Sequence, residues 1–64
     1  MIVRIIQRER QIPTVKGTRE LSWWAVQKYS QADGGWVSIN AVDTLTEARE
    51  FCNFIGAKNV EIVR

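Results

Sequence analysis

The chain of 64 residues contains a single cysteine, Cys52, and no histidine, so neither a disulfide nor a metal site is available to stabilise it. One thiol cannot form a disulfide within the chain, and a thiol without an imidazole provides too few ligands for a structural zinc site. A domain of this length buries only about 60% of its unfolded surface, so it must be held by dense packing or by self-association. Hydrophobic residues make up 45% of the sequence, and we expect one packed domain over residues 1–64.

Runs of β-branched and aromatic residues predict four strands. The polar segment Glu9–Glu20 contains Pro13 and Gly17, and we interpret it as a connection that is open to forming a hairpin arm closing near Lys16-Gly17. Asp33-Gly34 predicts a two-residue hairpin turn between the second and third strands. The four expected strands are Ile2–Arg8, Leu21–Ser30, Trp36–Val42 and Val60–Val63.

The segment after the third strand predicts a helix. Thr44 and Glu47 fit a capping box, and Gly56 is a natural stop. One apolar stripe follows from the helical period, formed by Leu45, Ala48, Phe51, Cys52 and Ile55. The order strand–strand–strand–helix–strand predicts an α+β fold, in which a three- to four-stranded, mainly antiparallel sheet carries one amphipathic helix on one face.

The expected turn sorts the side chains of the sheet into two faces. If Ala32 pairs with Gly35, the inner face receives apolar residues from every strand. Lys28 is the one awkward member of this face, and its stem can reach past a sheet edge. The inner set is Val3, Ile5, Trp24, Val26, Lys28, Ser30, Val37, Ile39, Ala41, Val60 and Ile62.

The opposite, outer face then combines aromatic, amide and arginine side chains, and such a surface is typical of an interaction site. Our candidate binding residues are Trp23, Tyr29, Trp36, Arg4, Arg8, Gln27 and Asn40, with Gln31, Ser38, Ile2, Ile6, Val42 and Val63 beside them. Three alternatives stay open. The Glu9–Glu20 segment covers Trp23 and Tyr29 by burying Ile12 and Val15, the face forms a homodimer contact, or it binds a dedicated partner.

Two other residues on the helix need an explanation. Cys52 lies on the apolar stripe, and we expect a small core residue rather than a nucleophile. Phe54 lies beside Glu47 and Glu50, away from the stripe. The commoner arrangement folds such a residue onto neighbouring structure, and exposure as a contact residue is the alternative.

The sequence offers no set of catalytic residues. Without histidine there is no usual general base near neutral pH and no common metal ligand, and the serines stand alone on predicted strands. Gly34-Gly35 belongs to a hairpin rather than to a phosphate-binding loop. We therefore expect no enzyme, no cofactor, no metal and no small-molecule substrate.

We expect no signal peptide at the start of the chain, because Arg4 interrupts the first apolar stretch. No segment approaches the length of a membrane span, and a single free cysteine fits a reducing compartment. We expect a cytoplasmic protein without membrane contact.

The charges are distributed unevenly along the chain. Residues 1–20 carry five basic and two acidic side chains, a net charge of +3, whereas residues 21–64 carry four basic and five acidic ones, a net charge of −1. The basic part suggests an alternative function, in which nucleic acid binds the sheet aromatics together with an arginine-rich arm. Its candidate residues are Arg4, Arg8, Arg10, Lys16 and Arg19.

The stretch from Trp36 to Gly56 has the form of a strand, the pattern Ala41-x-x-Thr44-x-x-Glu47-Ala48 and a helix. It resembles the corresponding segment of the T7-type phage inhibitors of host RNA polymerase, and this implies a small inhibitor from a phage. It is also similar to the three-strands-then-helix DNA-binding domains of phage integrase arms and plant AP2-type factors. Those domains imply DNA reading by basic residues on the sheet, whereas strands two and three supply only Lys28 here.

From these patterns the favoured function is a protein-interaction module, an inhibitor or adaptor that uses the aromatic and amide outer face. Nucleic-acid binding and an obligate homodimer are the alternatives.

Overall fold

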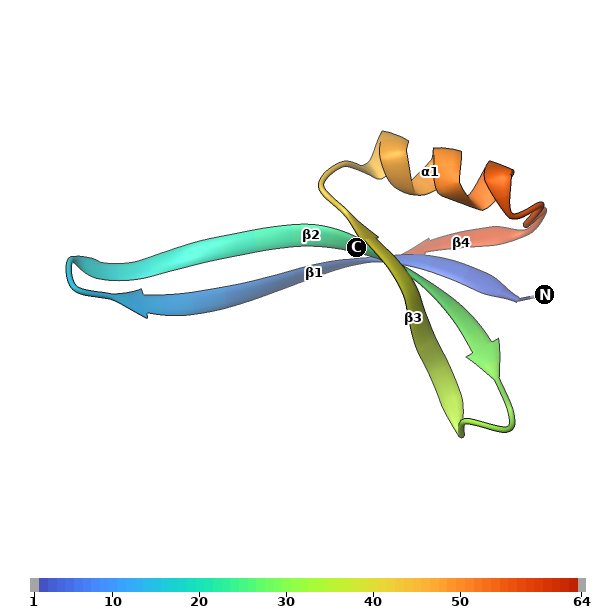
Figure 1. Cartoon of the computed structure of the whole chain (residues 1–64), viewed down its shortest axis with the longest axis horizontal. Coiled ribbons are helices and arrows are strands. Elements are labelled where there is room, and N and C mark those ends of the chain that lie inside the picture. The colour runs from blue at the N-terminus through green and yellow to red at the C-terminus, as the bar shows by residue number, and fades with distance from the viewer. Residues whose placement is uncertain (1, 64) are drawn as a thin grey trace.

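Three antiparallel strands are followed by one helix and a fourth strand in the computed structural model, which describes residues 2–63 (Figure 1). The strands are β1 (Val3–Thr14), β2 (Gly17–Ser30), β3 (Gly35–Val42) and β4 (Val60–Val63), and the helix α1 spans Leu45–Phe54. They form one sheet of order β3-β2-β1-β4, in which β4 runs parallel to β1. The predicted α+β class and element order are confirmed.

The core lies between α1 and one face of the sheet. Val3, Ile5 and Val26 are buried from the sheet side, and Ala48 and Cys52 are buried from the helix side. The predicted inward positions on β1 are therefore confirmed. The partly buried residues packed around them include Leu45, Phe51 and Ile55 of the predicted stripe and Trp24, Ile39, Val60 and Ile62 of the predicted inner face, together with Val42 and Ala57.

The two ends of α1 follow from local chemistry. The Thr44 hydroxyl accepts a hydrogen bond from the Glu47 amide at 3.2 Å and donates one to the Glu47 carboxylate, as an N-cap residue does. At the other end, Gly56 has φ +76° and its amide donates to Asn53, while the Ala57 amide donates to Cys52. This pair of bonds is the Schellman motif that a glycine at this position favours.

The segment Glu9–Glu20 is almost entirely strand rather than a loop. β1 and β2 stay paired as far as Thr14 and Gly17, and only Val15 and Lys16 form the turn. The hairpin extends away from the part of the sheet that α1 covers (Figure 1), and Val15 is fully exposed. The predicted closure near Lys16-Gly17 is confirmed, but the interpretation that this segment covers Trp23 and Tyr29 is wrong, because the two strands pair with each other and extend away from the body of the sheet.

The turn between β2 and β3 differs from the predicted two-residue turn. Ser30 pairs with Gly35, so residues 31–34 form the connection, closed by a 3.2 Å bond from the Gly34 amide to the Gln31 carbonyl. A two-residue turn at Asp33-Gly34 needs positive φ at both residues, and of these only Gly34 has it, at +79°. Gln31 therefore lies in the turn and not on the outer face.

A β-bulge changes which side of the sheet the side chains in the second half of β3 lie on. The register shifts between Gln27, which pairs with Ser38, and Val26, which pairs with Asn40. The extra residue, Ile39, packs against the core, and beyond it Val42 also turns to the core while Ala41 pairs with Ala25. The predictions that place Ala41 inward and both Asn40 and Val42 outward are wrong, because one extra residue reverses the alternation.

Phe54 is 86% exposed at the end of α1, so the prediction that it folds onto neighbouring structure is wrong. Phe54 is the last residue of α1 and does not join Phe51 and Ile55, which pack on the core. Beyond Gly56 the chain turns back to the sheet as β4 (Figure 1). Within residues 2–63, no helix is long and apolar enough to cross a membrane.

Candidate functional site

The outer face is the side of the sheet opposite α1, and a row of polar side chains crosses its centre. Arg4, Gln27 and Ser38 are neighbours in the register of β1, β2 and β3. The Arg4 Nε donates to the Gln27 Oε1 at 2.7 Å, and the Gln27 Nε2 donates to the Ser38 Oγ at 3.1 Å. Gln27 is only 8% exposed, and these two bonds satisfy its buried amide.

Two aromatic rings extend this row toward the β2–β3 turn. Tyr29 pairs with Trp36, and their rings meet edge to face with centroids 5.6 Å apart. The Arg4 guanidinium lies 4.2 Å from the Trp36 ring centroid, which is cation–π distance. We call Arg4, Gln27, Tyr29, Trp36 and Ser38 the outer-face cluster. Its side chains are held in place before any partner arrives.

The predicted binding residues are only partly brought together. Arg4, Gln27, Tyr29 and Trp36 form the cluster, whereas Trp23 pairs with Arg8 further along the same face. Asn40 pairs with the buried Val26, and its side chain accepts a bond from the next amide, so it lies outside the cluster.

Beyond Trp23, β1 and β2 continue as a two-stranded arm formed by residues 8–23. The register runs without a bulge from Arg8 opposite Trp23 to Thr14 opposite Gly17. Alternation then places three arginines on one side, which continues the outer face and which we call the basic side. Its members are Arg8, Arg10, Ile12, Arg19, Leu21 and Trp23, and the opposite, acidic side carries Glu9, Gln11, Pro13, Thr18, Glu20 and Ser22.

The two glutamates of the acidic side interact with each other. A hydrogen bond with Glu20 and the like charge of that carboxylate raise the pKa of Glu9. The register places both carboxylates on this side of the arm. The charges of the arm are therefore separated by side rather than mixed.

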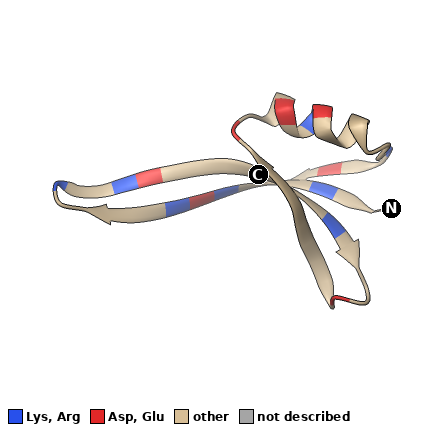
Figure 2. Ribbon diagram, in the orientation of Figure 1, with Lys and Arg blue, Asp and Glu red and all other residues tan. Residues whose placement is uncertain are grey.

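The separation extends over the rest of the sheet. Among the described residues of β1, β2 and β3, the outer face and the basic side carry four arginines, because Arg4 joins the three of the arm, and no carboxylate. The first outer-face carboxylate is Glu61, next to Arg4 on the edge strand β4. Figure 2 shows that the acidic residues of α1 lie on the other side of the sheet.

The sequence alone does not predict this sorting, because Pro13 and Gly17 make the segment resemble a connection. The signal was present in the alternation Arg8-Glu9-Arg10, with Arg19-Glu20 opposite. Of the predicted nucleic-acid residues, Arg4, Arg8, Arg10 and Arg19 share one surface, and Lys16 lies in the turn at the tip.

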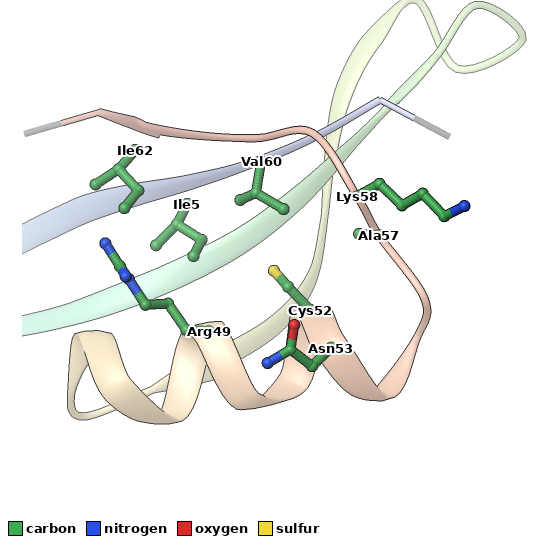
Figure 3. Close-up of a pocket in the computed structure, with 8 residues that line it drawn as sticks. All are labelled: Ile5, Arg49, Cys52, Asn53, Ala57, Lys58, Val60 and Ile62. Carbon is green, nitrogen blue, oxygen red and sulfur yellow. The ribbon is translucent and has the colours of Figure 1, made fainter.

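A hollow lies between α1 and β4 (Figure 3) and has a volume of about 310 Å³. Cys52 points into it, and burial raises the pKa of this thiol, which favours its neutral form. Arg49 and Lys58 lie at its two ends, and no carboxylate lines it to act as a base. Within residues 2–63, no three cysteine, aspartate or glutamate side chains gather as metal ligands.

No family model matches this chain, and neither a curated protein nor a solved structure matches it.

Proposed function

We propose that the protein is a small, non-enzymatic binding module for nucleic acid, and that the outer face and the basic side of the arm form its contact surface. The single observation that supports this is the separation of charge by strand register. Four arginines lie on a surface of three strands without a carboxylate, while Glu9 and Glu20 lie on the opposite side of the arm. Structural stability does not require such sorting on an exposed arm.

Arginine side chains on an extended, exposed surface suit a polyanion. Each guanidinium offers several donors in a fixed plane and binds phosphate in two-point contacts. Nucleic-acid binding releases counterions from the phosphate backbone, so affinity depends steeply on salt. The exposed Ser38 hydroxyl adds a neutral polar group at the centre of the same face.

The direct test is fluorescence anisotropy with labelled DNA and RNA oligonucleotides across a salt series. If Arg4, Arg8, Arg10 and Arg19 each neutralise one phosphate, the logarithm of affinity falls with the logarithm of salt at a slope of about −3 to −4. Absence of binding at low salt, or binding that salt does not change, would contradict the proposal.

A protein partner, bound by an inhibitor or adaptor, is the second candidate, and the outer-face cluster is the observation that favours it. Trp, Tyr and Arg dominate the residues that anchor protein interfaces, and here Tyr29, Trp36 and Arg4 already hold one another. Tyr29 is 49% exposed, so it can reach a partner without rearrangement. Under this candidate, Tyr29→Ala abolishes binding while arm variants keep it.

Self-association through the same face stays a prediction. A mass in solution twice that of the chain, lost in Tyr29→Ala, would support a homodimer. A monomer would leave the face available to other partners.

A further inference from the structure

The arm has the dimensions of an element that enters a groove. From Arg8 opposite Trp23 to Thr14 opposite Gly17 it contains seven register pairs. Six steps at about 3.4 Å give a ribbon about 20 Å long, with its two strands about 4.8 Å apart. The major groove of B-form DNA is about 12 Å wide and admits a two-stranded ribbon of this kind.

The arm is also free to enter such a groove. No helix packs against it, because α1 covers the other end of β1 and β2 (Figure 1). From Arg8 to Ser22 every residue is exposed except Ile12, which is half-buried. An exposed ribbon with one arginine side and one acidic side can present only the arginine side to a polyanion.

Resting on the proposed function, we infer that the arm binds double-stranded, B-form DNA by placing its basic side in the major groove. Arg8, Arg10 and Arg19 bind phosphates and guanine edges there. Glu9 and Glu20 stay turned to solvent on the acidic side. The outer face, which continues the basic side, then lies against the neighbouring backbone with Arg4 toward it.

Single-stranded nucleic acid fits this surface less well. Unpaired bases bind by stacking on free aromatic faces. One ring face of Trp36 is occupied by the Arg4 guanidinium, and Tyr29 meets the same ring with an edge contact. Beyond Trp23 at its base, the basic side of the arm offers only Ile12 and Leu21 as apolar side chains. The arm therefore offers arginine hydrogen-bond donors, which suit a duplex, rather than the free aromatic rings on which unpaired bases stack.

Double-stranded RNA fits less well for a geometric reason. The major groove of an A-form helix is deep and narrow, and side chains do not reach its base edges. A ribbon about 20 Å long that carries arginines in its centre needs the open groove of B-form DNA.

The first experiment compares three fluorescein-labelled probes of one sequence: duplex DNA, its single strand, and the corresponding duplex RNA. The variant Arg8→Gln/Arg10→Gln/Arg19→Gln removes the three arm charges. The matched control Lys28→Gln/Arg49→Gln/Lys58→Gln removes three charges that lie off the basic side. Circular dichroism and thermal unfolding check that both variants fold.

We expect duplex DNA to bind most tightly. The arm variant should lose affinity on the order of 100-fold, and its salt slope should fall by about 3, because three ionic contacts are gone. The control should change affinity by no more than about threefold, through net charge alone. Equal binding of the three probes, with the arm variant still weakened, overturns the groove inference and leaves the proposed function standing. An arm variant that binds like the control overturns the groove inference and also removes the arm from the proposed contact surface. Absence of binding to all three probes at low salt overturns both.

A second experiment tests which side and which groove are used. Ile12 and Gln11 are neighbours on opposite sides of the arm, so Ile12→Lys should steepen the salt slope by about 1 and Gln11→Lys should leave it unchanged. Methyl green, which occupies the major groove, should displace the protein, and netropsin, which occupies the minor groove, should not. Equal effects of the two lysines, or displacement by netropsin alone, overturn the inference.

Discussion

β1 and β2 each belong to two regions, the body under α1 and the arm. In the body, Val3, Ile5 and Val26 are buried against the helix, and their alternation is dictated by hydrophobicity. In the arm, the same two strands keep their pairing without any core, and their alternation sorts charge instead. The body therefore explains why the chain folds, and the arm carries sequence information that folding does not need.

The largest expected effect is the difference in the free energy of unfolding that one substitution causes in the body and in the arm. Ile5→Ala removes a fully buried side chain from the core, and we expect a loss of about 2–5 kcal/mol in the free energy of unfolding. Ile12→Ala makes the matched change at a half-buried position of the arm, where no core surrounds the side chain, and should cost no more than about 1 kcal/mol. Urea denaturation followed by tryptophan fluorescence measures both, and similar losses would mean that the arm is part of the folding unit.

The next largest effect tests whether the outer-face cluster stabilises the fold of the body or serves binding alone. Gln27→Ala removes the acceptor of Arg4 and the donor to Ser38, and it leaves a small void on a buried position. We expect a loss of about 1–2 kcal/mol in stability, from two hydrogen bonds with partly exposed partners.

Gln11→Ala is the matched control, because this glutamine lies on the acidic side of the arm without a neighbouring core. Thermal unfolding of both variants gives the comparison. If Gln27→Ala is as stable as Gln11→Ala, the cluster contributes nothing to the fold and its residues are free for a partner.

The helix cap provides a smaller effect within the body. Thr44→Ala removes the hydroxyl that accepts the Glu47 amide bond, and we expect a cost of about 1 kcal/mol. Thr14→Ala removes a hydroxyl that donates to Gly17 at 2.8 Å beside the tip of the arm. Because that bond is exposed and holds no helix, its loss should cost less than about 0.5 kcal/mol. Chemical denaturation resolves the two, and a reversed order would contradict the division between body and arm.

The two regions also differ in how far the sequence predicts them. The helix was predicted because its signals are local: Thr44 and Glu47 at one end, Gly56 at the other, and a stripe between them. Val3 and Ile5 were placed correctly because burying them on one face leaves Arg4 on the other. Where one face of an element is buried, hydrophobicity reports the structure.

The missed features have no hydrophobic signature. The bulge at Ile39 lies between Ser38 and Asn40, with no glycine to mark it in the sequence. The arm has no buried face, so its strands show no apolar alternation, and Pro13 suggested a loop. Its only periodic signal is the alternation of charge, and the strand register is needed to show that this alternation places the arginines on one side and the glutamates on the other.

The smallest effect is a pH dependence confined to the arm. Glu20 raises the pKa of Glu9 above its ordinary value of 4.5, so the folded arm binds a proton more readily than the unfolded chain. The resulting stabilisation is complete below the ordinary pKa and is lost as the pH rises through the raised one, where two carboxylates repel each other. Amide exchange in the arm should therefore be slower in acid than expected from the chemistry of exchange alone, while the body is unaffected.

The variant Glu20→Gln removes the like charge and the carboxylate partner. It should lower the pKa of Glu9 toward 4.5, which a carbon-detected NMR titration measures directly, and it should abolish the extra protection of the arm in acid. Glu61→Gln, on the edge strand β4, is the control that changes net charge equally without touching this pair. An unchanged Glu9 titration in Glu20→Gln would mean that the two carboxylates, although on one side of the arm, do not interact.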